Sequence, residues 1–458
     1  AASSAAAAAV AVRREGRRKL RRISVQLVSA YAREALREAA ALCGIAIEDG
    51  ASCQWADFST HDWDALLEGS DPFRRVSCFY TRAGLVRKAM LSHYLQKRQR
   101  QAAKTGANLE VDVLPAGFVV DIQDEEDLGS LRAQLLESAR KSPPTPGHPV
   151  WVAKASASNR GENLFIAHSV EHVLEAMRPP ALEGGIVEWV VQRYIAPPML
   201  IEGRKLHIRA HFVATGCPYC GTARAWLHRK HHAVLVATAP YSGATQDRLE
   251  HLTNHCVQVQ HPEYDERRQI LALDELDGVL GRPGLAALVL GRMQEALAEA
   301  LAAAAAAPVG FAPLPQCFEL LGADFTLEDR GADRPPGVWL LEVNAGPDLE
   351  IFGTRLRHRC VELLRDTLRL AVEPYLCEAA PLKFSSDTAD CTCASGAAAS
   401  SAGFVGERCL WAAAPRAASA AEELAGFKRR VGIAGRWARA LHEGSGVVVR
   451  GPQGMATQ

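Results

Sequence analysis

One stretch of the sequence, Phe318–Leu349, constrains the fold more than any other. It reads FELLGADFTLEDRGADRPPGVWLLEVNAGPDL, with two apolar runs joined by a polar segment rich in Gly and Pro. The runs are Phe318–Leu327 and Val338–Val343, and short apolar runs bounded by turn residues are typical of buried strands. The sequence therefore predicts a β-hairpin that lies in a buried sheet.

Three polar side chains of this hairpin point to a metal site. Strand side chains alternate in direction, so Glu342 and Asn344 should share one face while Leu341 and Val343 occupy the other. With Asp324 from the first strand, they would bring two carboxylates and an amide oxygen together, a ligand set that suits Mg²⁺. The alternative is that Glu342 faces water and Asn344 caps a turn. An unpaired buried carboxylate is costly, which favours a metal or a basic partner opposite Glu342.

Composition bounds the class of protein. The 458 residues suffice for a large core or two to three packed subdomains, and 52 Lys+Arg balance 52 Asp+Glu. Whole-chain charge therefore predicts neither a nucleic-acid nor a membrane partner, and an acidic substrate must be met by local basic clusters. The uncharged stretch Ala300–Phe318 is interrupted by prolines, so we expect no membrane span. The twelve cysteines show no framework spacing and predict reduced thiols, and Cys217 and Cys220 lie between two apparent strands, where a thioredoxin-like or zinc site is not expected.

Periodicity and turn signals divide the chain into elements and five segments. Expected strands are Ile23–Val28, Val111–Ile122, Trp151–Lys154, Gly185–Ile195 and Leu200–Val213. Expected helices are Ala30–Leu42, Glu125–Arg140, His168–Met177, Arg267–Ala307 and Cys360–Tyr375, with a short strand and helix within Cys78–Gln96. The expected segments are a disordered basic tail (1–22), an N-terminal subdomain (23–145), two further subdomains (146–195 and 196–378) and a largely disordered low-complexity tail (379–458).

Basic residues recur beside small-residue loops and on one strand. Lys154 ends a strand and leads into ASASNRGENL, where Arg160 and Gly161 form the basic centre of a flexible loop suited to covering phosphate. Further on, Lys205 and Arg209 alternate with apolar residues, so one face of that strand is basic. A solvated strand face is the usual explanation of such a pattern. Basic and acidic faces around one cleft would instead suit a nucleoside triphosphate with Mg²⁺.

Taken in order, several motifs resemble the tubulin–tyrosine ligase family, which has an ATP-grasp fold. The motifs are WVAKASASNRG, VVQRYI, GRKLHIR, HLTNHCVQ and FELLGADF…WLLEVN, and the resemblance runs from roughly Cys78 to Tyr375. HLTNHCVQ and FYTRAGLVRKA look closer to tubulin–tyrosine ligase proper than to its polyglutamylase or polyglycylase relatives. The resemblance implies an α/β (α+β) fold in which the nucleotide lies between two mainly antiparallel sheets, beside a smaller N-terminal α/β subdomain.

The resemblance also implies a role for each matching residue. Arg209 would contact the γ-phosphate and stabilise the reacting centre, and Asp324, Glu342 and Asn344 would hold Mg²⁺. The remaining residues would bind ATP: Lys88, Lys154, Arg160, Gly161, Gln192, Arg193, Tyr194, Ile195, Lys205, Thr253 and Asn254. The implied cofactors are ATP and Mg²⁺, with K⁺ as a further candidate cation.

The implied activity is ATP-dependent addition of tyrosine to the C-terminal carboxylate of detyrosinated α-tubulin through an acyl phosphate. The partners would be the α-tubulin tail and a free amino acid, with no nucleic acid and no membrane. The expected location is cytoplasmic and associated with the cytoskeleton, and the Ala/Ser-rich, basic N-terminal stretch leaves organelle targeting open. Two alternatives remain: another tubulin-tail ligase (a glutamylase or glycylase), or a catalytically silent ATP-binding scaffold.

Three departures from the family pattern bear on these expectations. His207 stands where the family has an acidic residue, which affects one nucleotide contact. Asn163 replaces a further Gly in the phosphate loop. Val234 and Leu235 occupy the positions at which the family carries an Arg that holds the acceptor amino acid. The neighbouring run HRKHH (228–232) is a candidate replacement for that cation.

Overall fold

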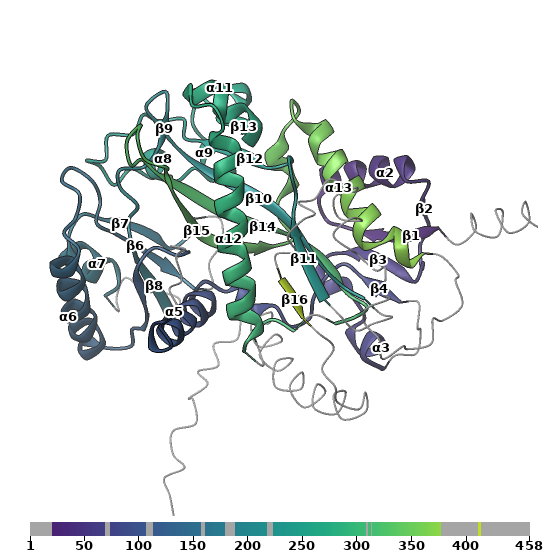
Figure 1. The fold of residues 1–458 in the computed structure, drawn as a ribbon, viewed down its shortest axis with the longest axis horizontal. Coiled ribbons are helices and arrows are strands. Elements are labelled where there is room, and N and C mark those ends of the chain that lie inside the picture. Colours follow the sequence, from purple (N-terminus) through teal and green to yellow (C-terminus); the bar gives the residue numbers. More distant parts are fainter. Residues whose placement is uncertain are drawn as a thin grey trace, which may run out of the picture.

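The computed structural model describes residues 21–68, 74–106, 113–156, 161–178, 188–217, 223–307, 310–312, 314–376 and 411–413. Three sheets run across the molecule in Figure 1, each flanked by helices. The two expected disordered tails, 1–22 and 379–458, lie outside these ranges apart from residues 21–22 and 411–413. In the described part of the chain, no helix has the length and apolar character needed to cross a bilayer.

The N-terminal unit is a small parallel sheet. Its strands are β1 (Arg22–Gln26), β2 (Ala46–Ile47), β3 (Cys53–Ala56) and β4 (Arg75–Val76), in the order β2-β1-β3-β4. Helix α2 (Ala30–Leu42) has the expected bounds, because its apolar face repeats with helical spacing and the Ser29 side chain caps the backbone N–H of Ala32. Helix α3 (Trp63–Glu68) follows β3.

The central sheet is antiparallel, with the order β5-β8-β6-β7. Its strands are β5 (Gly117–Asp121), β6 (Trp151–Ala155), β7 (Leu164–Ala167) and β8 (Glu188–Arg193), and helices α6 (Glu125–Lys141) and α7 (Val170–Ala176) pack on it. Because β5 pairs along its whole length with β8, strand pairing crosses the division that we expected at residue 145.

The large sheet has eight strands within the described residues. They are β9 (Leu200–Ile201), β10 (Arg204–Gly216), β11 (Ala223–Leu227), β12 (Ala233–Val236), β13 (Ile270–Ala272), β14 (Phe318–Glu328), β15 (Gly337–Ala345) and β16 (Trp411–Ala413). The predicted hairpin is β14–β15, and β14 pairs antiparallel with β10 over eight residues. This pairing joins the basic strand to the acidic hairpin.

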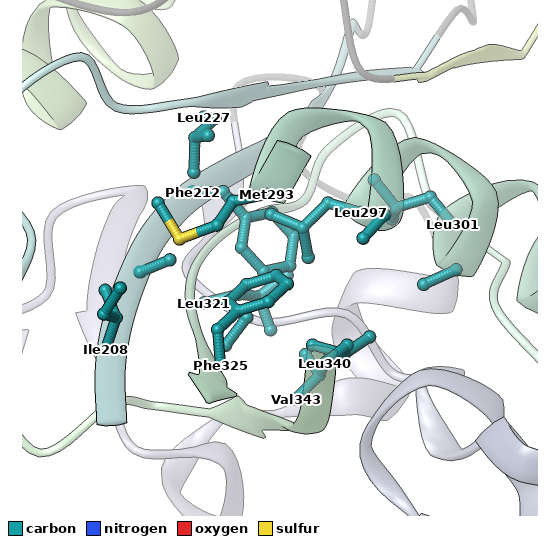
Figure 2. Packing of buried hydrophobic residues seen from close by; sticks show 14 of the residues in the cluster. Ile208, Phe212, Leu227, Met293, Leu297, Leu301, Leu321, Phe325, Leu340 and Val343 are labelled. Atoms are coloured by element: carbon teal, nitrogen blue, oxygen red, sulfur yellow. The ribbon is translucent and has the colours of Figure 1, made fainter. Parts of the chain in front are cut away.

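Side chains of β10 alternate between two cores. Ile208, Phe212 and their even-numbered neighbours pack with β14, β15 and helix α12 (Leu285–Ala305), as Figure 2 shows around Met293 and Leu297. On the opposite face, Val213 joins a second core with α2 and helix α13 (Arg357–Ala371). Lys205, His207 and Arg209 have the same parity as Val213 and therefore belong to this second face.

The expected helix Arg267–Ala307 is wrong as a single element. The structure divides it into α10 (Glu266–Gln269), strand β13, α11 (Leu276–Leu280) and α12, with Gly281 and Gly284 both at positive φ between the last two. β13 forms because it completes the edge of the sheet beside β12, a long-range pairing that overrides local helical preference. The turn signal Gly-Arg-Pro-Gly at 281–284 was present in the sequence.

Two other expectations also change. The segment Cys78–Gln96 contains no strand; it holds α4 (Ala83–Val86) and the start of α5 (Lys88–Lys104). Within the expected disordered tail, β16 pairs with β11 and so protects an otherwise open edge. The remaining short helices are α8 (Arg248–His251), α9 (His255–Gln258), and the 3-10 turns Phe58–Thr60, Leu273–Glu275, Leu349–Phe352 and Glu373–Tyr375.

Candidate active site

A pocket lies between the central sheet and the large sheet. It is lined from β6, β7 and β8 on one side and from β10, β14 and β15 on the other, with the 251–254 segment also contributing. Its lining contains these expected site residues: Lys88, Lys154, Gly161, Gln192, Arg193, Tyr194, Ile195, Lys205, Thr253, Asn254, Asp324 and Glu342. Residues that are up to 254 positions apart in the sequence (Lys88 to Glu342) therefore face one space.

The acidic residues converge through the register of the hairpin. Asp324 lies directly opposite Glu342, and the Asn344 amide Nδ2 is 3.3 Å from Asp324 Oδ2 and 3.2 Å from Glu342 Oε1. A register shift between Asp324 and Phe325 makes Leu341 the extra residue of a β-bulge. Leu341 consequently lines the pocket, whereas Val343 is buried in the core, so our expectation that these two residues share a face is wrong.

Each carboxylate is compensated by a cation from another element. Arg209 lies opposite Asp324 in the β10–β14 register and grips it in a two-point contact, through Nε to Oδ1 and through Nη2 to Oδ2 at 3.0 Å. Lys88 Nζ, at the start of α5, is 3.2 Å from Glu342 Oε2. Burial alone would raise the pKa of Asp324, but the charge and hydrogen bonds of Arg209 outweigh it and hold this pKa below its ordinary value. The expectation of a basic partner opposite Glu342 is met by Lys88.

Two further lysines face the pocket from opposite sheets. Burial lowers the pKa of Lys154 to about 8 and that of Lys205 to about 7, and the charge of Lys154 contributes to the second shift. The Lys205 ammonium lies over the Tyr194 ring at 4.4 Å from its centroid. Such desolvated lysines are poised for an anion, because a bound negative charge would restore their ordinary pKa.

His207 occupies the centre of the same face. Only 4% of it is exposed, and burial lowers its pKa to about 4, so the ring is neutral near pH 7. Its Nδ1 is hydrogen-bonded to Thr253 Oγ1, while its Nε2 is buried, has no hydrogen-bond partner among the described groups, and lies 3.8 Å from Asp324 Oδ1. The residue that departs from the family pattern thus faces the pocket directly.

The chemistry of this donor set fits both implied ligands. Two carboxylates and an amide head that touches both of them form an all-oxygen site for Mg²⁺, once Asn344 presents its oxygen. Lys154, Lys205 and Arg209 supply the positive charge that phosphates require. Apolar side chains of Val152, Ile166 and Leu341 add the flat surfaces that suit a purine ring.

Several lining residues were missed by the sequence analysis. Val152 is two positions before Lys154, so strand alternation would have placed it on the same face. Ile166 and Leu164 alternate on β7 in the same way. Leu341 depends on the bulge, and no local signal indicates a register shift. Arg160, which was expected in the phosphate loop, lies outside the described residues.

Neither the residues at the position of the missing Arg nor the cations of the candidate replacement line the pocket. Leu235 is opposite His207 in the β10–β12 register and is buried in the core, as is Val234. In the HRKHH run, Arg229 and Lys230 are exposed and neither lines the pocket.

The histidines of the HRKHH run have a structural role. His228 Nδ1 accepts the backbone N–H groups of Lys230 and His231, at 3.1 and 3.0 Å, which leaves the ring proton on Nε2, 3.2 Å from Asp366 Oδ2 on α13. His228, His231 and Asp366 have the proximity of a metal site, but a protonated Nε2 cannot be a ligand. We therefore interpret the cluster as a hydrogen-bonded anchor between this loop and α13.

Comparison with known proteins agrees with this geometry. The model of the tubulin-tyrosine ligase family matches residues 68–380. Tubulin monoglycylase TTLL3 of Danio rerio is 29% identical over 234 residues, which cover 49% of this chain and 29% of that protein. A probable tubulin–tyrosine ligase of Schizosaccharomyces pombe is 26% identical over 364 residues, which cover 71% of this chain and 83% of that protein. The chain thus spans less than a third of the monoglycylase.

A solved structure supplies the fold. The C-terminal domain of Kluyveromyces lactis Pby1, described as an ATP-grasp enzyme that interacts with the mRNA decapping enzyme Dcp2, superposes with a TM-score of 0.55 at 20% identity. The match covers 79% of this chain and 97% of that domain. The expected fold class, a mixed α/β ATP-grasp arrangement with antiparallel sheets, is confirmed. This chain is a member of the tubulin–tyrosine ligase family with an ATP-grasp fold.

Proposed function

We propose that the protein is an ATP-dependent ligase that joins a protein carboxylate to the amine of a free amino acid. One observation carries the proposal: cationic side chains and oxygen ligands from both sheets and from α5 gather at a single pocket. Lys88, Lys154, Lys205, Asp324 and Glu342 line this pocket. Arg209 and Asn344 are not among its lining residues, but each of them contacts Asp324. A structural ion-pair network would not require two desolvated lysines that face each other across the pocket.

The charges of the pocket assign tasks in phosphate binding. Burial lowers the pKa of both Lys154 and Lys205, because it removes the water that stabilises their positive charge. The negative charge of a bound triphosphate would stabilise these ammonium groups in place of that water. Arg209 pairs with Asp324, and Lys88 pairs with Glu342. When a metal ion is bound, each carboxylate would interact with both its cationic partner and the metal. When bound by Asp324, Glu342 and Asn344, Mg²⁺ would offset charge on the phosphates.

The reaction follows from the weakness of a carboxylate as an electrophile. A carboxylate oxygen attacks the γ-phosphorus of ATP, the bond to the bridging oxygen breaks, and ADP leaves. The amine then attacks the acyl carbon, loses a proton, and expels inorganic phosphate. Arg209 suits the first step because its planar fork is already held by Asp324 and remains charged at any relevant pH.

For the finer specificity, we propose tyrosine as the amino acid and the C-terminal carboxylate of detyrosinated α-tubulin as the acceptor. The motifs HLTNHCVQ and FYTRAGLVRKA support this choice. The long match to a probable tubulin–tyrosine ligase supports it too. The corresponding location would be the cytoplasm, on the cytoskeleton.

A second candidate, a tubulin glycylase or glutamylase, is favoured by a different observation. Leu235 stands where a cation is expected to hold the acceptor amino acid, and the β10–β12 register places it on the same face of the sheet as Arg209. The similarity to a tubulin monoglycylase points the same way. A silent scaffold is disfavoured by the two acids, because a protein without phosphoryl-transfer chemistry does not require a metal site beside the phosphates.

Mass spectrometry of tubulin tails tests the specificity. Purified protein is incubated with Mg·ATP, detyrosinated tubulin and tyrosine, glycine or glutamate in separate reactions. Tyrosine on the C-terminal carboxylate supports the leading proposal, whereas glycine or glutamate on a side-chain carboxylate supports the second. ATP binding without modification by any of the three would contradict ligase activity on tubulin.

A further inference from the structure

The unpartnered nitrogen of His207 has no role in the function described so far. It belongs to a residue that is only 4% exposed, and the other ring nitrogen, Nδ1, is hydrogen-bonded to Thr253 Oγ1. Buried polar atoms without a partner are rare in folded proteins, and each one calls for a missing ligand, water or ion. The position of this atom therefore indicates what should occupy the neighbouring space.

The β10–β14 register places His207 beside the acidic residues. Arg209 is directly opposite Asp324, so His207, two residues before it on the same face, is a diagonal neighbour of Asp324. His207 Nε2 lies 3.8 Å from Asp324 Oδ1. Two ligands of one octahedral ion, each roughly 2.1 Å from it, are separated by about 3 Å when adjacent and about 4 Å when opposite. The observed 3.8 Å lies between these two values, so the two atoms would share one ion after a relative movement of less than about 1 Å.

The tautomer of His207 is compatible with metal binding. Donation from Nδ1–H to the Thr253 hydroxyl oxygen leaves a lone pair on Nε2, the atom that faces the pocket. Histidine ligands characteristically donate their other ring N–H to a nearby acceptor in this way. The reverse arrangement would leave an Nε2–H group buried without an acceptor, since 3.8 Å to Asp324 is too long for a hydrogen bond.

We propose that His207 binds the divalent cation through Nε2, together with Asp324, Glu342 and Asn344, and that this nitrogen shifts the preference of the site from Mg²⁺ toward Mn²⁺ and other first-row transition ions. Imidazole nitrogen binds such ions more strongly than it binds Mg²⁺, which prefers oxygen alone. An acidic residue at position 207 would give an all-oxygen site instead. This inference rests on the proposed function, because it assumes that the pocket holds Mg·ATP or its Mn²⁺ counterpart.

Pulsed electron paramagnetic resonance of bound Mn²⁺ tests the inference without measuring activity. The full chain is loaded with Mn²⁺ and a non-hydrolysable ATP analogue, and hyperfine coupling from a directly bound ¹⁴N is recorded. We expect this coupling in the wild type and in His93→Gln, which alters an exposed histidine on α5. We expect its loss in His207→Gln and His207→Asp.

Metal competition provides the second readout. The ratio of Mn²⁺ to Mg²⁺ affinity, measured by displacement of Mn²⁺, should fall roughly tenfold or more in His207→Asp, because even loss of an outer-shell partner costs that much. Mn²⁺ that binds with the nucleotide but without ¹⁴N coupling would overturn the inference and leave the proposed function intact. No binding of Mn²⁺ or Mg²⁺ with the nucleotide would instead overturn the metal site itself.

Discussion

Replacing Lys205 by methionine should weaken the pH dependence of nucleotide binding. In the free pocket, burial lowers the pKa of Lys205 to about 7, and that of Lys154 to about 8. A bound triphosphate favours the charged ammonium and raises both pKa values toward their ordinary range. Nucleotide binding therefore takes up protons, and affinity is greatest below the free-state pKa values and falls as pH rises through them.

The magnitude follows from the fraction of each lysine that is charged in the free protein. With a pKa of about 7, Lys205 is roughly 1% protonated at about pH 9, which weakens binding about 100-fold relative to the plateau at low pH. Lys154, with a pKa of about 8, adds roughly a further tenfold. In Lys205→Met the plateau affinity is lower, and only the tenfold component remains.

Calorimetric titration with Mg²⁺ and a non-hydrolysable ATP analogue, repeated from about pH 6 to about pH 9, measures this dependence. Lys97→Met, which removes an exposed lysine of α5, serves as the matched control and should follow the wild type. Ionisation of the nucleotide itself cancels in the comparison between variants. A dissociation constant that does not change over this range in the wild type, or an equally steep change in Lys205→Met, would refute the assignment of Lys205 to the phosphates.

Three substitutions test the site and the core. Arg209→Lys keeps the charge but loses the two-point contact with Asp324. We therefore expect the single-turnover rate to fall roughly 10²- to 10³-fold, with little change in nucleotide affinity. An unchanged rate would exclude Arg209 from the reaction. Glu319→Gln leaves the largely buried Arg82 beside a neutral amide and should cost about 3 kcal/mol in urea unfolding. Glu171→Gln, at an exposed ion pair, should cost much less, and equal costs would contradict the role of burial. Phe325→Ala opens a cavity in the core shown in Figure 2 and should lower the free energy of unfolding by about 3–5 kcal/mol. A decrease of less than about 1 kcal/mol would contradict the observed packing.

Local patterns were sufficient for the elements with strong periodicity. Helix α2 begins and ends at the expected residues, since Ser29 caps it and its small apolar residues repeat on one face. The hairpin β14–β15 was predicted from its apolar runs and its turn. In both cases neighbouring residues supply the information that decides the structure.

The misjudged features depend on distant partners. β13 lies within a stretch that favours helix locally, but it completes the edge beside β12. The bulge that turns Leu341 into the pocket arises from the register between two strands, which sequence alternation alone cannot reveal.

Most of the expected site residues line one pocket, but the contacts between them could not be predicted from the sequence. The family resemblance implied roles for Arg209, Asp324 and Lys88, yet the contacts of Arg209 with Asp324 and of Lys88 with Glu342 join segments far apart in sequence. Similarly, the HRKHH run was visible as a basic cluster, but its His228 is hydrogen-bonded to Asp366, on a helix more than a hundred residues later.

The most direct test of the account is ATP-dependent incorporation of labelled tyrosine into detyrosinated tubulin, measured for the wild type and Glu342→Gln. Glu328→Gln is the matched control, because it makes the same change at the far end of the same hairpin, outside the pocket lining. The account predicts incorporation by the wild type and by Glu328→Gln, and a loss of at least roughly 100-fold in Glu342→Gln. Incorporation that persists in Glu342→Gln would contradict the assigned site, and its absence from all three proteins, with nucleotide still bound, would contradict tyrosine ligation.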